Sequence, residues 1–286
     1  MASSWRFSRI AAKSVKGAAL KQRLREFFVR DDPQYGALVQ RYQASTPGAK
    51  VFYLLLHVLP GFLVYAVINI PVVYQLVLRL TGLSGNNLQG WSVLAIFLGW
   101  HLITPLLVLR WADKLSFKDS LSFLGLARFD VKGFFLVLPV VFIVFTLCSW
   151  PYMKYVFPAL TSWVAAVPGL NPPSYSIYRD PSAAYGLFPG WFVALALIGN
   201  FLGEEIYFRG YLMKKIGFLG SSAWVVNSVL FALYHMWQAP TTWALIGPAF
   251  VFGLLMQWRK NLYPLIAFHF LINIVWSAII GSLLGS

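Results

Sequence analysis

The sequence predicts an all-α fold, a polytopic bundle of about seven transmembrane helices, from its composition and from the length of its apolar runs. Hydrophobic residues make up 59% of the 286 residues and charged residues only 11%. Runs of ~20 apolar residues, which cross ~30 Å of hydrocarbon as helix, recur along the chain. Their apolar character is continuous rather than alternating, which argues against a β-barrel. The runs lie at residues 51–79, 91–110, 132–150, 190–212, 221–238, 242–258 and 262–283.

A basic tail and linker, residues 1–50, precede the first run. Within residues 1–30, cations recur at helical spacing at Arg6, Arg9, Lys13 and Lys16. This spacing predicts an amphipathic helix that lies in the membrane interface and binds anionic lipid headgroups. The serines and the absence of an acid before Glu26 also fit an organellar transit peptide. The chain is expected in a bacterial cytoplasmic membrane. An organellar membrane, to which a transit peptide would direct the chain, is the alternative.

Residues 51–189 form a second region, with three of the runs and a long proline-rich excursion. Prolines are dense in residues 151–189, which predicts that no long regular helix crosses this loop. Its apolar part, FPALTSWVAAV, suits a short or re-entrant segment in the interface. The number of spans is accordingly expected to lie between six and eight.

The distribution of Lys and Arg over the loops gives the orientation. The N-terminal tail and the loops after the second, fourth and sixth runs are rich in cations, whereas the other loops carry few. Because cations concentrate in cytoplasmic loops, the N-terminus is expected inside and the C-terminus outside. The net charge of +14 is therefore mainly a topology signal. Nucleic acid is not expected as a partner, because no folded basic domain presents these charges.

Two adjacent glutamates, Glu204 and Glu205, lie with Arg209 inside the apolar stretch WFVALALIGNFLGEEIYFRGYL. Ionisable groups at membrane depth are costly, so they indicate a functional site. Glu205 and Arg209 are four residues apart on a helix and can neutralise each other. Glu204 points about 100° away around the helix, which leaves it free to act as a general base.

Three further polar groups lie in the last three runs. His235 lies in the fifth run, and His269 and Asn273 are one helical turn apart in the seventh. These groups are expected to meet Glu204, because lipid offers none of them a partner. Residue counts from the cytoplasmic ends place the site in the cytoplasmic half of the membrane. His57 and His101 are assigned to structural hydrogen bonds between helices.

These residues occur in three motifs that resemble the signature of the CPBP family, the CAAX-protease and bacteriocin-processing enzymes, also called ABI. The resemblance covers residues 191–276, within a catalytic helical core expected at residues 190–286. The motifs are Glu204-Glu205-x-x-x-Arg209, Phe231-x-x-x-His235 and His269-x-x-x-Asn273. The resemblance implies an intramembrane endopeptidase, which cleaves a CAAX-type or related membrane-associated protein or peptide.

The resemblance also implies a role for each residue. Glu204 and His235 would activate a water, while His269 and Asn273 would stabilise the oxyanion of the tetrahedral intermediate. Glu205 would support the site through Arg209. The substrate's identity does not follow from the motifs.

The sequence allows two interpretations of whether the reaction requires a metal. Glu204, His235 and His269 match a catalytic zinc ligand set, and family members are often labelled metalloendopeptidases. Similarity to the Ras-converting CAAX endopeptidases favours a metal-free, glutamate-dependent mechanism, and the sequence lacks H-E-x-x-H. No cofactor is therefore favoured, with zinc as the alternative.

Two other functions would use the same residues. A proton-coupled transporter would employ Glu204, His235 and His269 as a relay, although relays favour polar residues spread along a path. A catalytically idle member would act as a membrane scaffold or immunity factor. The intact signature favours the protease over both.

Overall fold

The computed structural model describes residues 17–170, 188–239 and 241–284, and within these residues every regular element is a helix. Seven helical stretches are long and apolar enough to cross a membrane. They are Pro47–Asn69, Gly85–Ala112, Gly133–Ala165, Gly190–Lys215, Gly217–Gln238, Thr241–Arg259 and Tyr263–Leu283, here called spans 1 to 7. The predicted fold class, an all-α multi-pass bundle, is confirmed.

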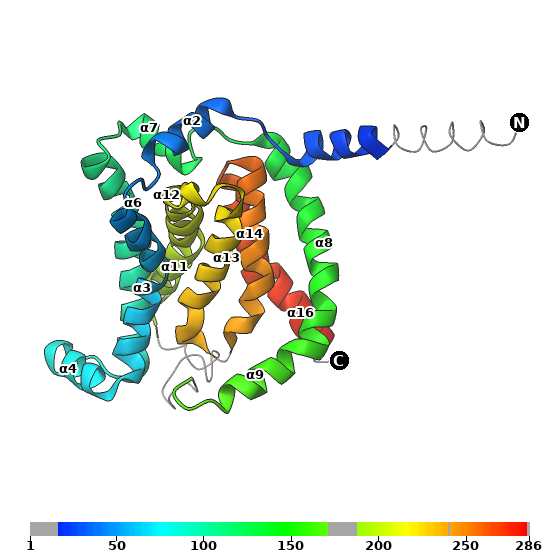
Figure 1. The fold of residues 1–286 in the computed structure, drawn as a ribbon. Coiled ribbons are helices and arrows are strands. Elements are labelled where there is room, and N and C mark those ends of the chain that lie inside the picture. Colours follow the sequence, from blue (N-terminus) through cyan, green and yellow to red (C-terminus); the bar gives the residue numbers. More distant parts are fainter. Residues whose placement is uncertain (1–16, 171–187, 240, 285–286) are drawn as a thin grey trace, which may run out of the picture.

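Span 1 is the helix α3 (Pro47–Asn69), which follows the short helix α2 (Pro33–Tyr42). The prediction that the first apolar helix extends to residue 79 is wrong. Ile70 has extended backbone angles (φ −92°, ψ 110°), as is common before a proline, and a separate helix α4 (Pro71–Thr81) begins there. Helix α4 projects sideways from the bundle (Figure 1). Its exposed apolar side chains recur at helical spacing and suit the membrane interface: Val72, Leu76 and Leu80.

In the sequence, the short helix α7 (Phe117–Leu124) lies between span 2 and span 3. Span 2 comprises α5 (Gly85–Leu94), η1 (Ala95–Ile103), α6 (Thr104–Leu107) and η2 (Val108–Ala112). Span 3 comprises η3 (Gly133–Val137), α8 (Leu138–Pro151), η4 (Tyr152–Val156) and α9 (Phe157–Ala165).

The continuation of span 3 to Ala165 corrects the expectation that no long helix enters residues 151–189. Pro151 does not end the helix, and the chain stays helical through Pro158 into α9. Figure 1 shows α9 turning away from the line of α8 and crossing the lower end of the bundle. Residues 157–165 of the apolar segment FPALTSWVAAV are therefore helical. Residues 171–187 lie outside the described residues.

Spans 4 to 7 contain the residues that the motifs single out. Span 4 comprises α11 (Gly190–Ile198), η5 (Gly199–Gly203), η6 (Glu205–Leu212) and α12 (Met213–Lys215). Span 5 comprises η7 (Gly217–Ser222), α13 (Ala223–Tyr234) and η8 (His235–Gln238). Span 6 comprises η9 (Thr241–Leu245) and α14 (Ile246–Arg259), and span 7 comprises α15 (Tyr263–Phe270), η10 (Leu271–Trp276) and α16 (Ser277–Leu284). Buried aromatic rings fill the core between these spans: Phe208, Phe231, Phe252 and Phe268.

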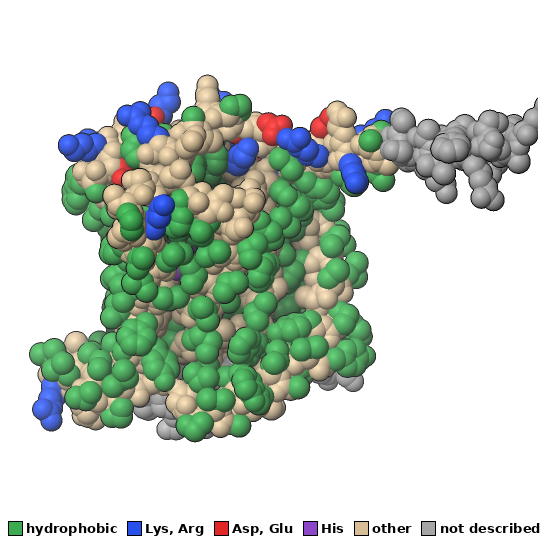
Figure 2. Space-filling view, in the orientation of Figure 1, with side chains coloured by type: hydrophobic (Ala, Val, Ile, Leu, Met, Phe, Trp, Pro, Cys, Tyr) green, Lys and Arg blue, Asp and Glu red, His purple; other side chains and the backbone are tan. Residues whose placement is uncertain are grey.

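The two ends of the bundle differ in charge. Figure 2 shows Lys, Arg, Asp and Glu side chains gathered at the end that carries α2 and α7, while the body of the molecule is apolar. Two ion pairs join segments at this charge-rich end. Arg259 donates to Asp130 through both Nε and NH2 at 2.7 Å. Lys215 donates to Asp113 at 2.5 Å. The opposite, charge-poor end carries α4, α9 and the connection from η8 to η9 (Figure 1).

The N-terminal tail is described only in part. Residues 17–28 are helical and extend from the charge-rich end (Figure 1). The cations on which the amphipathic prediction rests, Arg6, Arg9, Lys13 and Lys16, lie outside the described residues. The predicted contact with anionic lipid headgroups therefore stays a prediction.

Candidate active site

The motif residues meet at one small cavity inside the bundle. Glu204 lies between η5 and η6, His235 directly follows α13, His269 belongs to α15 and Asn273 belongs to η10. All four side chains line a cavity of about 100 Å³. The structure thus brings together groups from three spans that are separated by as many as 69 residues, the interval from Glu204 to Asn273.

Two glycines set the position of the helix that carries Glu204. Gly199 and Gly203 are four residues apart and face span 2. A Cβ on Gly199 would lie 2.7 Å from Cβ of Phe97, and a Cβ on Gly203 would lie 2.7 Å from the backbone oxygen of Phe97. Spans 2 and 4 can therefore approach closely only because both positions lack a side chain, as in other small-residue helix crossings in membranes.

The Glu204 carboxylate is buried and faces two imidazoles. Its Oε1 lies 3.6 Å from Nε2 of His235, and its Oε2 lies 4.0 Å from Nε2 of His269. Neither oxygen has a hydrogen-bond partner among the described residues. Both separations exceed a direct hydrogen bond, and a polar contact of this length suits a bridging water.

His235 is held with its Nε2 toward Glu204. Its Nδ1 lies 2.9 Å from the backbone oxygen of Phe231. A carbonyl oxygen can only accept, so Nδ1 donates to it, and Nε2 is the ring nitrogen that faces Glu204. The Thr242 hydroxyl donates to the backbone oxygen of His235, which fixes the start of η8.

His269 is bound by Glu205 rather than by Glu204. Its Nδ1 lies 3.0 Å from Oε1 of Glu205, and the same oxygen accepts from NH1 of Arg209 at 3.2 Å. Helical spacing pairs Glu205 with Arg209 alone, because it cannot show a partner from span 7. The structure adds His269 as a direct partner of Glu205, so the carboxylate joins spans 4 and 7.

Arg209 packs on two aromatic rings near the cavity. Its guanidinium carbon lies 3.8 Å from the ring centroid of Phe231 and 4.6 Å from that of Phe252. Both rings line the cavity. Arg209 and Glu205 are fully buried, with 0% of either side chain exposed. This cation–π packing holds a charge within the apolar core.

Asn273 donates through Nδ2 to Oδ1 of Asn200 at 2.7 Å, and Asn200 lines the same cavity. Asn200 is a site residue that was not singled out from the sequence. Its position in the sequence could have identified it. Asn200 precedes Glu204 by four residues in an apolar run, and the same spacing placed Asn273 on the helix face of His269.

The two remaining histidines have different surroundings. His57 is hydrogen-bonded at both nitrogens, to the Tyr53 backbone oxygen at 2.7 Å and to Asn227 at 3.1 Å. His101 is buried, stacks on Tyr207 with 4.8 Å between ring centroids and lies close enough to interact electrostatically with Glu204 and His235. His101 thus lies beside the site, whereas His57 belongs to a separate polar cluster. The assignment of His101 to a hydrogen bond between helices is wrong, because neither of its ring nitrogens has a hydrogen-bond partner among the described residues.

The residues fit a zinc ion in donor type but not in arrangement. Two imidazole nitrogens and a carboxylate are common zinc ligands, and both Nδ1 atoms are bonded to oxygen, as ligating histidines usually are. Within the described ranges, however, no group of three or more His, Cys, Asp or Glu side chains is placed to hold a metal ion.

Comparison with known proteins identifies the region that contains this site. Residues 186–275 match the family model described as type II CAAX prenyl endopeptidase Rce1-like. The matched segment includes all three motifs and Asn200. No curated protein and no solved structure matches the chain.

Proposed function

Since residues 186–275 form an Rce1-like domain of the CPBP family, we propose that this multi-pass membrane protein is a glutamate-dependent intramembrane endopeptidase. Its substrate is a membrane-associated protein or peptide, of the CAAX type or a related one. The observation that carries the proposal is the buried Glu204 carboxylate with the Nε2 atoms of His235 and His269 at 3.6 and 4.0 Å.

The first step is the activation of a water by Glu204 and His235. A water between these groups donates one hydrogen to a Glu204 oxygen and the other to Nε2 of His235. The Nδ1–H of His235 donates to the Phe231 backbone oxygen, which leaves Nε2 as the acceptor. Glu204 takes a proton as the water oxygen attacks the carbonyl carbon of the scissile peptide bond. The bond that forms is C–O, and the carbonyl oxygen becomes an oxyanion.

The oxyanion is stabilised by Asn273 and His269. Asn273 uses one amide hydrogen on Asn200, which leaves the other available to the cavity. His269 donates to Glu205 through Nδ1, so it can also donate through Nε2 when both ring nitrogens are protonated. Arg209 donates to the same Glu205 oxygen that binds Nδ1 of His269. Donors aimed at a developing oxyanion typically contribute about 3 kcal/mol each.

The intermediate collapses when the C–N bond breaks. The proton held by Glu204 passes to the leaving amine, which restores the carboxylate and releases a new amino terminus and a new carboxyl terminus. Every proton moves between the water, Glu204 and the peptide, so this cycle uses protein groups alone.

The proposal is tested by comparing the membrane proteomes of cells that carry the intact protein or Glu204→Gln. We expect cleavage fragments that appear with the intact protein and are absent with the variant. Glu26→Gln is the matched control, because it makes the same chemical change at an exposed glutamate whose side chain contacts Gln22. Identical fragment patterns with intact protein and Glu204→Gln would contradict the proposal.

A further inference from the structure

A second pocket lies at the charge-rich end of the bundle, apart from the Glu204 cavity. It has a volume of about 260 Å³ and shares no lining residue with that cavity. Helices α2 and α7, the segment that follows α7 and the turn between spans 6 and 7 all contribute to its lining. We call it the basic pocket, and its charged residues are Arg30, Asp32, Asp119, Arg128 and Lys260.

The two acids of the basic pocket are engaged locally, whereas two of its cations are not. Asp32 pairs with Arg30 at 3.1 Å, and Asp119 accepts from a serine hydroxyl at 2.6 Å at the start of α7. Among the described residues, the side chains of Arg128 and Lys260 form no ion pair and no hydrogen bond. The basic pocket therefore presents unused cationic donors, which suit an anion.

Hydrogen bonds between two segments hold these two cations at the same pocket. The buried Asn261 side chain donates to the backbone oxygen of Arg128 at 2.6 Å. The Tyr263 hydroxyl donates to the backbone oxygen of Leu126 at 3.1 Å. The turn that carries Lys260 is thus fixed against the segment that carries Arg128.

The backbone of Lys260 lies in the left-handed region, with φ 53° and ψ 34°. It follows the last residue of α14, a position at which glycine is favoured because it has no Cβ. A lysine here has a conformational cost, and its side chain forms no hydrogen bond or ion pair within the described part of the chain. A strained residue of this kind points to a role outside the fold itself.

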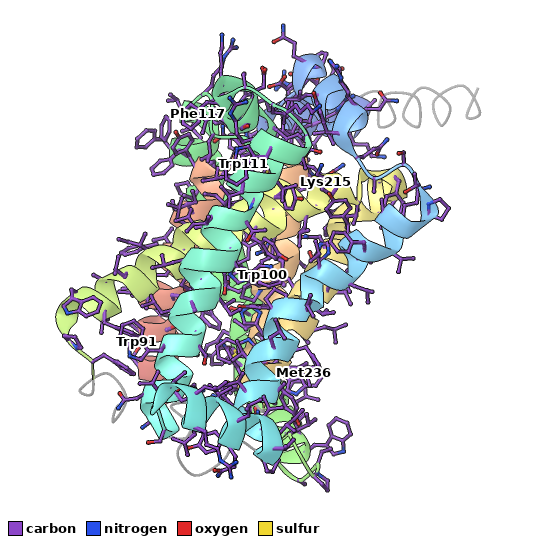
Figure 3. All side chains as sticks on the ribbon, turned by 90° about the vertical axis from the view of Figure 1, so that its left-hand side faces the viewer. Trp91, Trp100, Trp111, Phe117, Lys215 and Met236 are labelled. Atoms are coloured by element: carbon purple, nitrogen blue, oxygen red, sulfur yellow. The ribbon has the colours of Figure 1, made fainter. Side chains whose placement is uncertain are left out.

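Exposed aromatic side chains place the basic pocket at the level of the membrane interface. Figure 3 shows Trp111 and Phe117 at the charge-rich end, and they are 71% and 72% exposed. Aromatic side chains are enriched where a membrane protein meets the lipid headgroups. Phe117 is the first residue of α7, the helix that also supplies Asp119 to the basic pocket.

An apolar groove begins beside the basic pocket. Phe129 follows Arg128 in the sequence, and its ring packs on that of Tyr263 with 5.2 Å between centroids. Tyr263 lines a groove of about 790 Å³ whose other lining residues are all apolar and come mainly from spans 3 and 7. A ligand that joins an anionic group to a hydrocarbon chain fits a cationic pocket next to such a groove.

We propose that the basic pocket binds the phosphate group of an anionic phospholipid from the leaflet at the charge-rich end, with Arg128 and Lys260 as its cationic donors. Phosphate is the anion that Arg and Lys side chains commonly bind in proteins. The lipid's hydrocarbon chain lies along the groove that begins at Tyr263. This site is separate from the predicted contact of the N-terminal tail with headgroups, and it does not depend on the proposed function.

The proposal is tested on the full-length protein, purified and delipidated in a neutral detergent. Its thermal unfolding midpoint is measured during titration with phosphatidylglycerol, with phosphatidylcholine or with inorganic phosphate, since a ligand that binds the folded state raises the midpoint. The pocket variants are Lys260→Gly and Arg128→Gln. Arg79→Gln is the matched control, because it removes the same charge from an exposed position in α4.

We expect phosphatidylglycerol to raise the midpoint of the wild type and of Arg79→Gln at the same concentrations. Each pocket variant should need at least about tenfold more of this lipid for the same rise, because it lacks one charge-assisted contact. Phosphatidylcholine should have a smaller effect on the wild type. Without lipid, Lys260→Gly should unfold no lower than the wild type, because glycine accepts these backbone angles.

Four results would overturn the proposal. The first is an equal response to phosphatidylglycerol in the wild type and both pocket variants. The second is an equal response of the wild type to both lipids. The third is a rise with inorganic phosphate that matches the rise with phosphatidylglycerol and is lost in the pocket variants, which would identify free phosphate as the ligand. The fourth is a midpoint of Lys260→Gly below that of the wild type without lipid, which would show that the lysine side chain serves the fold.

Discussion

The Glu205 carboxylate lies 3.0 Å from Nδ1 of His269 and connects span 4 to span 7 in a buried charge cluster with Arg209. One oxygen of Glu205 thus serves two partners from different helices. This arrangement gives the two adjacent glutamates different roles. Glu204 faces the cavity, and Glu205 fixes the imidazole that is proposed to donate to the oxyanion.

Glu205→Gln should lower both folding yield and activity. The change leaves the Arg209 charge buried without its carboxylate, and breaking a buried pair in this way costs about 3–5 kcal/mol. The yield of folded protein after detergent extraction and its thermal unfolding midpoint measure the effect, and Arg209→Ala should behave similarly. Asp31→Asn is the control, because Asp31 forms an exposed ion pair with Arg25 and its loss should change little. A purely catalytic defect in Glu205→Gln with normal stability would contradict this role.

Asn200 should act on catalysis through Asn273. Asn273→Ala is expected to lower the turnover rate roughly 10²–10³-fold with near-normal substrate binding, as for other oxyanion donors. Asn200→Leu removes the acceptor that orients Asn273, so it should lower kcat by a smaller factor and leave KM nearly unchanged.

The double variant tests whether the two asparagines work as one unit. If Asn200 acts only by orienting Asn273, the double variant should be no slower than Asn273→Ala alone. Multiplication of the two single losses would show that Asn200 acts independently. Asn69→Leu is the matched control, since Asn69 bonds within α3, to the Tyr65 backbone oxygen, and lies away from the cavity.

Asp130 should make stability depend on acid pH. Burial raises the pKa of its carboxyl, but the hydrogen bonds from Arg259 and from the Gly133 backbone amide outweigh burial, and the pKa lies below its ordinary value. A depressed carboxyl pKa stabilises the folded state above the unfolded-state pKa of about 3.9, and this contribution is lost as the pH falls through the folded-state value. Thermal unfolding midpoints in detergent at pH 7 and at progressively lower pH measure it. The wild type should lose stability on acidification more steeply than Asp130→Asn; parallel curves would contradict the assignment.

The metal-free mechanism predicts that purified, active protein keeps its turnover after treatment with a strong chelator. Elemental analysis of the same sample measures bound zinc. If zinc instead takes part in the reaction, removal of one of its ligands, as in His269→Gln, should abolish metal binding. Stoichiometric zinc together with chelator-sensitive turnover would overturn the metal-free mechanism and leave Glu204 at the centre of the same site.

The helical fold and the family match over residues 186–275 could be predicted because they depend on local signals. Apolar runs of membrane length give the spans, and three short motifs give the residues at the cavity. Helix ends were harder: Pro71 separates α4 from span 1, whereas Pro151 does not end span 3. A proline removes one backbone donor in both cases, and packing by neighbouring helices decides which helix continues.

Contacts between distant spans could not be predicted from helical spacing. The pairing of Glu205 with His269 joins residues 64 positions apart, and the bond from Asn273 to Asn200 joins residues 73 apart. Likewise, the packing of Arg209 on Phe231 and Phe252 joins spans 4, 5 and 6. Such contacts are properties of the assembled bundle.

The role of Glu204 in activating water is tested most directly by cleavage in water enriched in oxygen-18. The substrate is a peptide that contains a Glu204-dependent cut site identified by the proteome comparison. It is incubated with purified wild-type protein or with Glu204→Gln, and the masses of the products are measured by mass spectrometry. We predict that the wild type forms a new carboxyl terminus carrying one oxygen-18 atom and that Glu204→Gln, folded to the same yield, forms none. Cleavage by Glu204→Gln at the wild-type rate, or wild-type products without the heavy oxygen, would contradict this role.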